Sequence, residues 1–342
     1  MRERIRLILA LCFYYTGIVQ LAHWWTRRFR PGLIILNYHR ATGENLGQQM
    51  RYLRRYYRVM HLEEALEEFF APQAKCADNR IPVVLTFDDG YSDNYSHAFP
   101  LARDLRLPFT IFLIPGYIDS GERFWWLEGK RLAYHAHVDK ITVEGHTYHL
   151  NTLEERKDLA KVIDTHVRHA SSVAEREAFL HDIRCAMMEA APEVLEQVDR
   201  EALPVTWTQV HEMEQSGWVS FGAHTMHHPI LSYLKDEQEM RQEVIQCKQI
   251  LEERVGHPIR TFAYPVGKTE HMSAEVVRAV KDAGYQWAVT TFEDVNTHQT
   301  DPYLLYRLPG DIEMHWSVMA AELLGLLGLS RRRRKYRARF SR

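Results

Sequence analysis

The sequence is poor in cysteine and has no cysteine motif. Its four cysteines, Cys12, Cys76, Cys185 and Cys247, are far apart and include no CxxC pair, which argues against a zinc ribbon and gives no sign of an oxidising compartment. No internal repeat is present, and the only low-complexity segment is a basic run at the C-terminus. A chain of 342 residues that is 46% hydrophobic and 26% charged is not disordered or collagen-like, and its length allows one large α/β domain or two smaller ones.

A long uninterrupted hydrophobic run is also missing. The most apolar stretch, residues 7–22, contains Thr16 and Gln20, so it is too short and too interrupted for a membrane-spanning helix of roughly 20 residues. A signal peptide fits poorly, because the stretch lacks a small-x-small cleavage pattern and ends in His-Trp-Trp at 23–25, followed by arginines. Aromatic residues beside arginines suit a segment that lies in the headgroup layer of a membrane.

The net charge of −2 hides an uneven distribution of charge along the chain. Residues 1–30 hold six Arg and one Glu, and residues 331–342 hold seven Arg and one Lys, which leaves 29 basic and 44 acidic residues in 31–330, a charge of −15. Leucines at 323–329 precede the C-terminal basic run, so both ends combine apolar and basic residues. An acidic body of this size argues against nucleic acid as a partner.

We therefore expect both ends to bind an anionic membrane surface, where each basic residue contributes about 1 kcal/mol. This predicts a protein that is peripheral on the inner membrane, with the cytoplasmic face favoured, and the alternative is a membrane anchor with the domain outside. A different interpretation of the same residues is a first helix that packs on the core and a solvated tail.

Between the two ends, short apolar strands alternate with amphipathic helices, which is the pattern of a mostly parallel α/β sheet. About seven βα units close into a barrel more readily than they form an open sheet. The candidate strands cover residues 33–38, 83–87, 109–114, 219–223, 261–263, 288–291 and 304–308.

One long segment interrupts this alternation. Residues 117–204 are far too long for an ordinary connection between a strand and a helix, so they predict an inserted helical subdomain. The sequence thus divides into a basic amphipathic membrane-associating segment at 1–30, a folded domain at 31–320 and an apolar, then polybasic tail at 321–342.

Two polar clusters follow predicted strands. Asp88 and Asp89 end the run Val-Val-Leu-Thr-Phe-Asp-Asp-Gly, and His224 and His228 lie in the run His-Thr-Met-His-His-Pro. Parallel α/β folds build their sites at this end of their strands. Imidazoles four residues apart share one side of a helical turn and suit a metal such as zinc. His227 is an alternative ligand to His228.

These motifs make the chain resemble the polysaccharide deacetylases, the NodB-homology group called carbohydrate esterase family 4. The resemblance rests on Thr-Phe-Asp-Asp-Gly at 86–90, His-Thr-x-x-His-Pro at 224–229 and Phe-Ala-Tyr-Pro-x-Gly at 262–267, in the order of the family, and it covers roughly residues 33–310. It implies a deformed (β/α) barrel that holds a divalent metal, with Zn²⁺ expected first and Co²⁺, Ni²⁺ or Mn²⁺ as alternatives.

The resemblance also assigns roles to the motif residues. It implies that Asp89, His224 and His228 hold the metal, and that Asp88 is the general base. Such an enzyme removes the N-acetyl group of an amino sugar, with a metal that polarises the amide carbonyl and lowers the pKa of a water. The third motif would supply an oxyanion and acetyl pocket, which consists of Tyr264, Pro265 and the backbone N–H of Val266.

The chain departs from the commonest pattern of the family at several positions. Ala263 replaces an arginine that pairs with the base, Val266 replaces an aromatic residue, and a late Leu-x-His segment that supplies the acid is missing. The poly-N-acetylglucosamine deacetylase branch is similar in its third motif and takes the acid from an early Tyr-His segment, which implies His39 here. We further expect Arg307 as the partner of the carboxylate, and Trp287 as a wall of the acetyl pocket or as a plain core residue.

The sequence thus predicts a metal-dependent N-deacetylase that acts on a polysaccharide or a lipid-linked glycan. The two basic ends and the insertion motivate an alternative, a deformylase of a lipid-linked sugar. The missing arginine and late histidine motivate another, a catalytically degenerate member of the family that only binds glycan.

Overall fold

The computed structural model describes residues 2–29, 32–71, 78–187 and 200–327. The predicted polybasic run at 331–342 lies outside the described residues. Ten strands are described, eight of them in one sheet. The parallel strands of the main sheet are β1 (Ile34–Tyr38), β2 (Arg58–Val59), β3 (Pro82–Phe87), β4 (Phe109–Leu113), β7 (Val219–Ala223), β8 (Thr261–Ala263), β9 (Trp287–Val289) and β10 (Leu308–Pro309).

Seven of these strands follow one another around a curled sheet in the order β10-β1-β3-β4-β7-β8-β9, and β2 pairs beside β3. A single segment links the two edges of the sheet: Leu305 forms a parallel bridge with Val289 of β9, and Leu308 pairs with Leu36 of β1. The strands therefore form a deformed (β/α) barrel, which confirms the predicted fold class.

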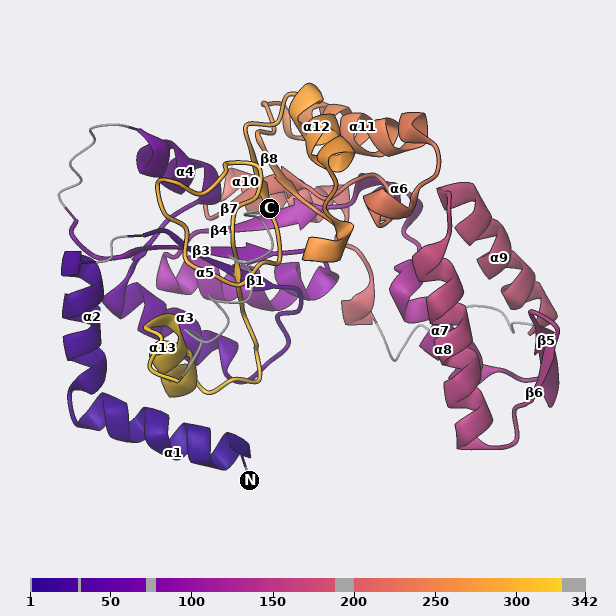
Figure 1. Cartoon of the computed structure of the whole chain (residues 1–342), viewed down its shortest axis with the longest axis horizontal. Helices are drawn as coiled ribbons and strands as arrows, with labels where there is room; N and C mark the ends of the chain where they lie inside the picture. Colours follow the sequence, from indigo (N-terminus) through magenta and orange to yellow (C-terminus); the bar gives the residue numbers. More distant parts are fainter. Residues whose placement is uncertain (1, 30–31, 72–77, 188–199, 328–342) are drawn as a thin grey trace.

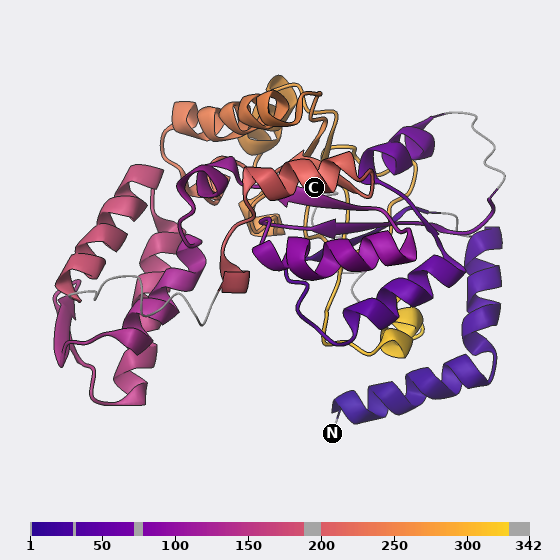
Figure 2. The same ribbon diagram turned by 180° about the vertical axis from the view of Figure 1, so that it is seen from behind.

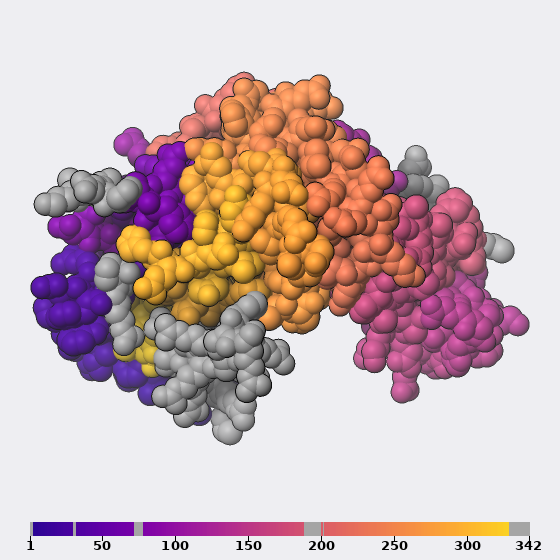
Figure 3. Space-filling model, turned by 45° about the horizontal axis from the view of Figure 1, so that its top comes forward, coloured from indigo at the N-terminus to yellow at the C-terminus, as the bar shows by residue number. Residues whose placement is uncertain are grey.

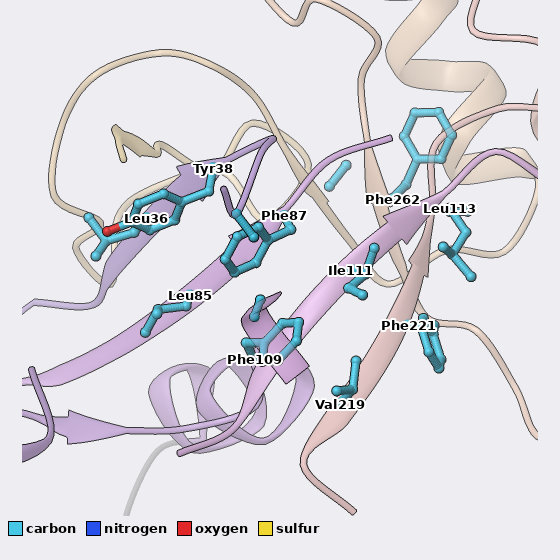
Figure 4. Packing of buried hydrophobic residues seen from close by; sticks show 14 of the residues in the cluster. Leu36, Tyr38, Leu85, Phe87, Phe109, Ile111, Leu113, Val219, Phe221 and Phe262 are labelled. Atoms are coloured by element: carbon cyan, nitrogen blue, oxygen red, sulfur yellow. The ribbon is translucent and has the colours of Figure 1, made fainter. Parts of the chain in front are cut away.

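Successive residues of the barrel strands are buried on opposite faces, so the strands are apolar on both sides. One face packs under the surrounding helices and contributes Leu85, Phe87, Ile111 and Phe221 to the largest hydrophobic cluster (Figure 4). The other face lines the barrel interior and forms a separate cluster with residues of the helix Leu62–Phe70. Its members are Leu33, Ile35, Met60, Leu62, Ala65, Leu66, Val84, Phe112, Ala263, Trp287, Val289 and Leu305.

Helices surround the curled sheet (Figures 1 and 2). A π-helical turn, η1 (Asn94–Ala98), leads into α5. The α-helices outside the insertion are α1 (Arg2–Tyr15), α2 (Ile18–Phe29), α3 (Leu46–Tyr56), α4 (Leu62–Phe70), α5 (Phe99–Leu105), α6 (Pro115–Ser120), α10 (Trp207–Gln215), α11 (Glu237–Val255), α12 (Ala274–Asp282) and α13 (Trp316–Leu323).

The segment between α6 and α10 forms a lobe beside the barrel (Figures 1 and 3). It contains α7 (Trp125–His135), the antiparallel hairpin of β5 (Lys140–Val143) and β6 (His146–His149), α8 (Leu153–His169) and α9 (Val173–Ala186). These elements surround a hydrophobic cluster of their own, which extends to Tyr91 and Ile114 of the barrel loops. The lobe is therefore joined to the barrel at the end of the strands that carries the motif residues.

Candidate metal centre

The motif residues lie where strands β3 and β7 end, in a strained backbone. Asp89, Thr225, His228 and Val266 have φ values of 73°, 65°, 56° and 60°, which non-glycine residues seldom adopt. They are four of only six such non-glycine residues in the described part of the chain. Strained conformations persist where the surrounding structure imposes them, and they cluster at functional sites. The backbone alone therefore marks these loops as a functional centre.

Asp89, His224 and His228 form the one group of three in the described residues that could hold a metal ion, with all ligand atoms within 4.8 Å of one another. Asp89 Oδ1 lies 3.4 Å from His224 Nε2 and 3.5 Å from His228 Nε2. All three side chains are buried, and neither Asp89 Oδ1 nor His228 Nδ1 has a hydrogen-bond partner among the described residues. Buried polar atoms are normally satisfied. The donor set, in which the unpartnered oxygen of Asp89 faces an imidazole nitrogen of each histidine, fits a divalent cation.

The tautomer of His224 also suits a ligand. His224 Nδ1 lies 2.7 Å from the carbonyl oxygen of Ala263, to which it donates, so Nε2 keeps its lone pair and faces Asp89. Burial opposes a charge on His224, but its close contact with Asp89 and the charges of both aspartates outweigh burial and raise the pKa of His224. Burial, aided by the charge of His224, lowers the pKa of His228.

Asp88 is buried beside this group and is fully paired with Arg307. Arg307 donates from Nη1 and Nη2 to the two carboxylate oxygens of Asp88, both at 2.7 Å. Burial opposes ionisation of Asp88, but the charges of Arg307 and His224 and the Arg307 hydrogen bonds outweigh it and lower the pKa of this carboxyl group. Asp88 is therefore held as a carboxylate within a nearly dry site.

Arg307 reaches Asp88 from the segment that links the two edges of the barrel. Its side chain is 0% exposed, and it also donates to the carbonyl oxygen of Thr290 at 2.8 Å and to Thr86 Oγ1 at 3.2 Å. On β8, Ala263 stands where the commonest pattern of the family has an arginine. Arg307, from a different part of the chain, brings a guanidinium to the carboxylate instead. The structure brings together the two residues that the sequence predicts as partners.

His39 lies at the open side of the site, after β1. Its Nε2 is 4.0 Å from Asp88 Oδ2, and its side chain is 53% exposed. The loop behind it is tied down by two buried neighbours: Asp93 Oδ2 accepts hydrogen bonds from the backbone N–H groups of Ala41 and Thr42, and Asn94 donates to the carbonyl oxygen of His39 at 3.0 Å. Asp93 also accepts from Arg40 Nε at 2.7 Å. His39 is thus accessible to a ligand on a fixed backbone.

The third motif follows β8 at the same end of the barrel. Pro265 lies between Tyr264 and Val266. Tyr264 is buried and donates from its hydroxyl to the carbonyl oxygen of Tyr303 at 3.0 Å. No atom of the described residues accepts a hydrogen bond from the N–H of Val266, while its carbonyl oxygen accepts from Thr291 Oγ1 at 2.9 Å. The left-handed backbone at Val266 thus leaves one N–H available.

Trp287 is not brought to this centre. It begins β9 opposite Thr261, at the amino ends of the strands, whereas the motif residues follow the carboxyl ends. Its ring packs in the interior cluster with Leu62 and Leu66 of α4, and the guanidinium of Arg260 lies 5.5 Å from the ring centroid. Trp287 therefore packs as a core residue, at the opposite end of the barrel from the motif residues.

Trp126 and Glu243 also lie beside motif histidines, although no motif could have revealed them. Trp126, at the start of the lobe in α7, lies with its ring centroid 4.4 Å from that of His228, and its Nε1 donates to Tyr91 Oη at 2.7 Å. Glu243 of α11 is buried and accepts from the backbone N–H of His227 at 2.9 Å and pairs with His227 Nδ1 at 2.6 Å. Because His227 faces Glu243, it points away from the group formed by His224 and His228.

The chain is similar to known proteins over most of its length. A family model described as polysaccharide deacetylase matches residues 75–176 and 194–288. These ranges contain Asp88, Asp89 and both histidines, but neither His39 nor Arg307. The Bacillus subtilis protein YxkH, itself provisionally assigned as a polysaccharide deacetylase, is 23% identical over 297 residues, which cover 83% of this chain and 74% of that protein.

Solved structures share the fold. The Streptococcus pyogenes deacetylase PplD in complex with acetate matches with a TM-score of 0.55 and 17% identity, over 84% of this chain and 96% of that one. IcaB from Ammonifex degensii has a TM-score of 0.54 and 21% identity over 85% and 96% of the two chains. The BpsB deacetylase domain from Bordetella bronchiseptica has values of 0.52 and 15% over 82% and 96%.

Proposed function

We propose that this chain, which belongs to the polysaccharide deacetylase family of hydrolases, removes the N-acetyl group from an amino sugar of a polysaccharide or a lipid-linked glycan. The observation that carries the proposal is the pair of adjacent buried carboxylates at the end of β3. Asp88 is saturated by Arg307, whereas Asp89 keeps an unpartnered oxygen toward two histidines. The site thus combines a carboxylate that Arg307 orients, suited to act as a base, with three side chains that could bind a metal.

We assign the metal to Asp89, His224 and His228, with Zn²⁺ as the first expectation and Co²⁺, Ni²⁺ or Mn²⁺ as alternatives. When bound, such a cation polarises the amide carbonyl and lowers the pKa of the attacking water. Asp88 then accepts the proton of that water, because its carboxylate lies beside the ligand group and is kept ionised by Arg307.

The remaining roles belong to groups at the rim of the centre. The departing amine must be protonated, and His39 is the donor nearest to Asp88 with a solvent-exposed ring. The free N–H of Val266 is available to the oxyanion that forms on the carbonyl oxygen. The ring of Trp126 beside His228 gives the substrate an aromatic wall.

The test measures acetate and formate release from a panel of free and lipid-linked N-acylated sugars, with and without chelator. Asp88→Asn and Asp89→Asn form a matched pair. We expect both to abolish turnover, but Asp88→Asn should keep stoichiometric metal while Asp89→Asn should lose it. His39→Ala should lower kcat and keep metal.

Four outcomes would contradict these assignments. Substantial turnover by Asp88→Asn removes Asp88 as the base, and loss of metal from His39→Ala removes His39 as the acid. If the wild-type protein binds metal and glycan but releases neither acetate nor formate from any substrate, it is instead a degenerate, glycan-binding member of the family. Formate release without acetate release from lipid-linked sugars would identify a deformylase.

A further inference from the structure

The exposed apolar side chains of this protein are concentrated in its first two helices. Ten large hydrophobic residues of the described chain are exposed, and nine of them lie in α1 and α2. The tenth, Leu153, lies in the lobe. The nine are Ile5, Ile8, Leu9, Tyr15, Ile18, Leu21, Trp24, Trp25 and Phe29, which we call the outer face of α1 and α2. Folded soluble surfaces rarely collect apolar side chains in this way.

The opposite sides of the two helices are packed against the barrel domain. Ala10 of α1 and Val19 of α2 are buried. Tyr14 contacts the ring of Trp316 at 4.8 Å between centroids and shares a hydrogen bond of 2.9 Å with Tyr56 Oη. The helices are therefore apolar on both sides, and the inner side already has its partner.

His23 shows how firmly α2 belongs to the domain. Its Nε2 lies 3.1 Å from Tyr52 Oη, and its ring centroid lies 4.8 Å from that of Tyr57. Burial, together with the charge of Arg27, lowers the pKa of His23 to about 4, so the ring is neutral at pH 7. In addition, Arg6 of α1 forms an ion pair with Glu322 of α13. Both helices are fixed parts of the fold.

We propose that the outer face of α1 and α2 docks this protein onto a lipid surface with anionic headgroups. Charge complementarity selects this occupant: Arg4, Arg27 and Arg28 are exposed on the same two helices, and Glu3 is their only acidic residue. Two copies facing each other would bring these arginines together, whereas lipid phosphates neutralise them. Trp24, Trp25 and Phe29 beside the arginines match the headgroup level of a bilayer.

The geometry favours a surface contact. No single described helix is long and apolar enough to cross a bilayer, and α1 and α2 reach that threshold only as a pair that bends by 75°. In Figures 1 and 2, α1 lies along one side of the molecule, toward which the free ends of the lobe also extend. The docking surface is rigidly attached to the catalytic domain, and the inference does not depend on the proposed chemistry.

The experiment is flotation of the full chain with vesicles of phosphatidylcholine alone and of phosphatidylcholine with phosphatidylglycerol. The triple variant Ile8→Ser, Leu21→Ser, Trp25→Ser should bind both vesicles at least about 100-fold more weakly. Arg27→Gln with Arg28→Gln should lower binding to the anionic vesicles about 25-fold and leave binding to the neutral ones unchanged. Leu153→Ser is the matched control and should bind like the wild type.

Each outcome decides the inference. Vesicle binding that survives the triple variant, or that falls equally with Leu153→Ser, would overturn it. A wild type that ignores vesicles and instead forms a dimer, dissociated by the triple variant in sedimentation equilibrium, would show that a second copy covers this face. The unfolding midpoint of each variant separates loss of the surface from loss of the fold. Deacetylase activity enters none of these measurements, so failure of the catalytic proposal would be recognised separately.

Discussion

The pairing of Arg307 with Asp88 makes the sharpest prediction about this centre. Arg307→Met removes the charge and keeps an unbranched apolar stem. The variant loses two hydrogen bonds of 2.7 Å to Asp88 and the bonds to Thr290 and Thr86, and it leaves a buried carboxylate without its partner. Breaking one side of a buried pair costs about 3–5 kcal/mol of folding free energy. We expect a loss of that size.

The double variant separates the charge pair from simple loss of packing. Asp88→Asn with Arg307→Met leaves a neutral amide where the single variant leaves an uncompensated charge, so the double variant should be more stable than the sum of the two singles by about 1–3 kcal/mol. Arg307→Lys keeps a charge but cannot form both parallel bonds, and it should fall between the wild type and Arg307→Met.

The assay is equilibrium unfolding in denaturant with chelator present, so that metal binding does not add to stability. Turnover is measured separately on the metal-loaded proteins and should fall about 100-fold or more for Arg307→Met, since Asp88 loses the partner that orients it and favours its ionised form. A single variant within about 1 kcal/mol of the wild type, or strictly additive costs in the double variant, would refute a buried ion pair of this importance.

Three other variants test groups around the centre. Asp93→Asn should lower kcat about tenfold while metal content stays unchanged, because it loosens the loop of His39; pre-steady-state turnover and metal analysis check this. Trp126→Ala should raise KM for glycan more than it lowers kcat, since its ring lies beside His228; equal effects on both would count against a substrate-facing wall. Burial of Glu128 in the lobe opposes its charge, but hydrogen bonds and charges of two arginines lower its pKa. The stabilisation of the fold by the Glu128 carboxylate is therefore complete above the pKa of the unfolded chain, about 4.3, and is lost as pH falls through the lower pKa of the folded protein. The thermal unfolding midpoints of Glu128→Gln and the wild type should differ at pH 7 and converge below the folded pKa.

Much of the barrel could be predicted from the sequence because its strands are buried on both faces and read as continuous apolar runs. The predicted strands at 219–223 and 261–263 have the bounds of β7 and β8. The predicted strand at 304–308 is different: only Leu305 and Leu308 pair with neighbouring strands. Between them, the N–H groups of Tyr306 and Arg307 bond to Asn296 Oδ1 and the carbonyl oxygen of Phe292, which are long-range partners that no local pattern indicates.

The candidate site was predictable to the extent that strand ends assemble it. Asp89, His224 and His228 follow parallel strands, so their meeting at one end of the barrel follows from topology. Glu243 and Trp126 arrive from a helix and a lobe with no recognisable spacing, and only the folded chain shows their contacts. Trp287, which the sequence left open between a pocket wall and a core residue, begins β9 at the amino end of the barrel, away from the motif residues.

The two adjacent aspartates differ in their partners, and this difference supports the proposed roles of base and metal ligand. Asp88 and Asp89 are equally buried, so burial alone gives them the same chemistry. Arg307 binds both oxygens of Asp88, and a cation bound there would have to face that guanidinium at close range, which is unfavourable. Asp89, turned to φ 73° by the strained loop, has an unpartnered oxygen toward two imidazoles and no arginine. The strain at Asp89 and the distant Arg307 therefore act together: the first turns one carboxylate toward the two histidines, and the second keeps the other ionised and paired.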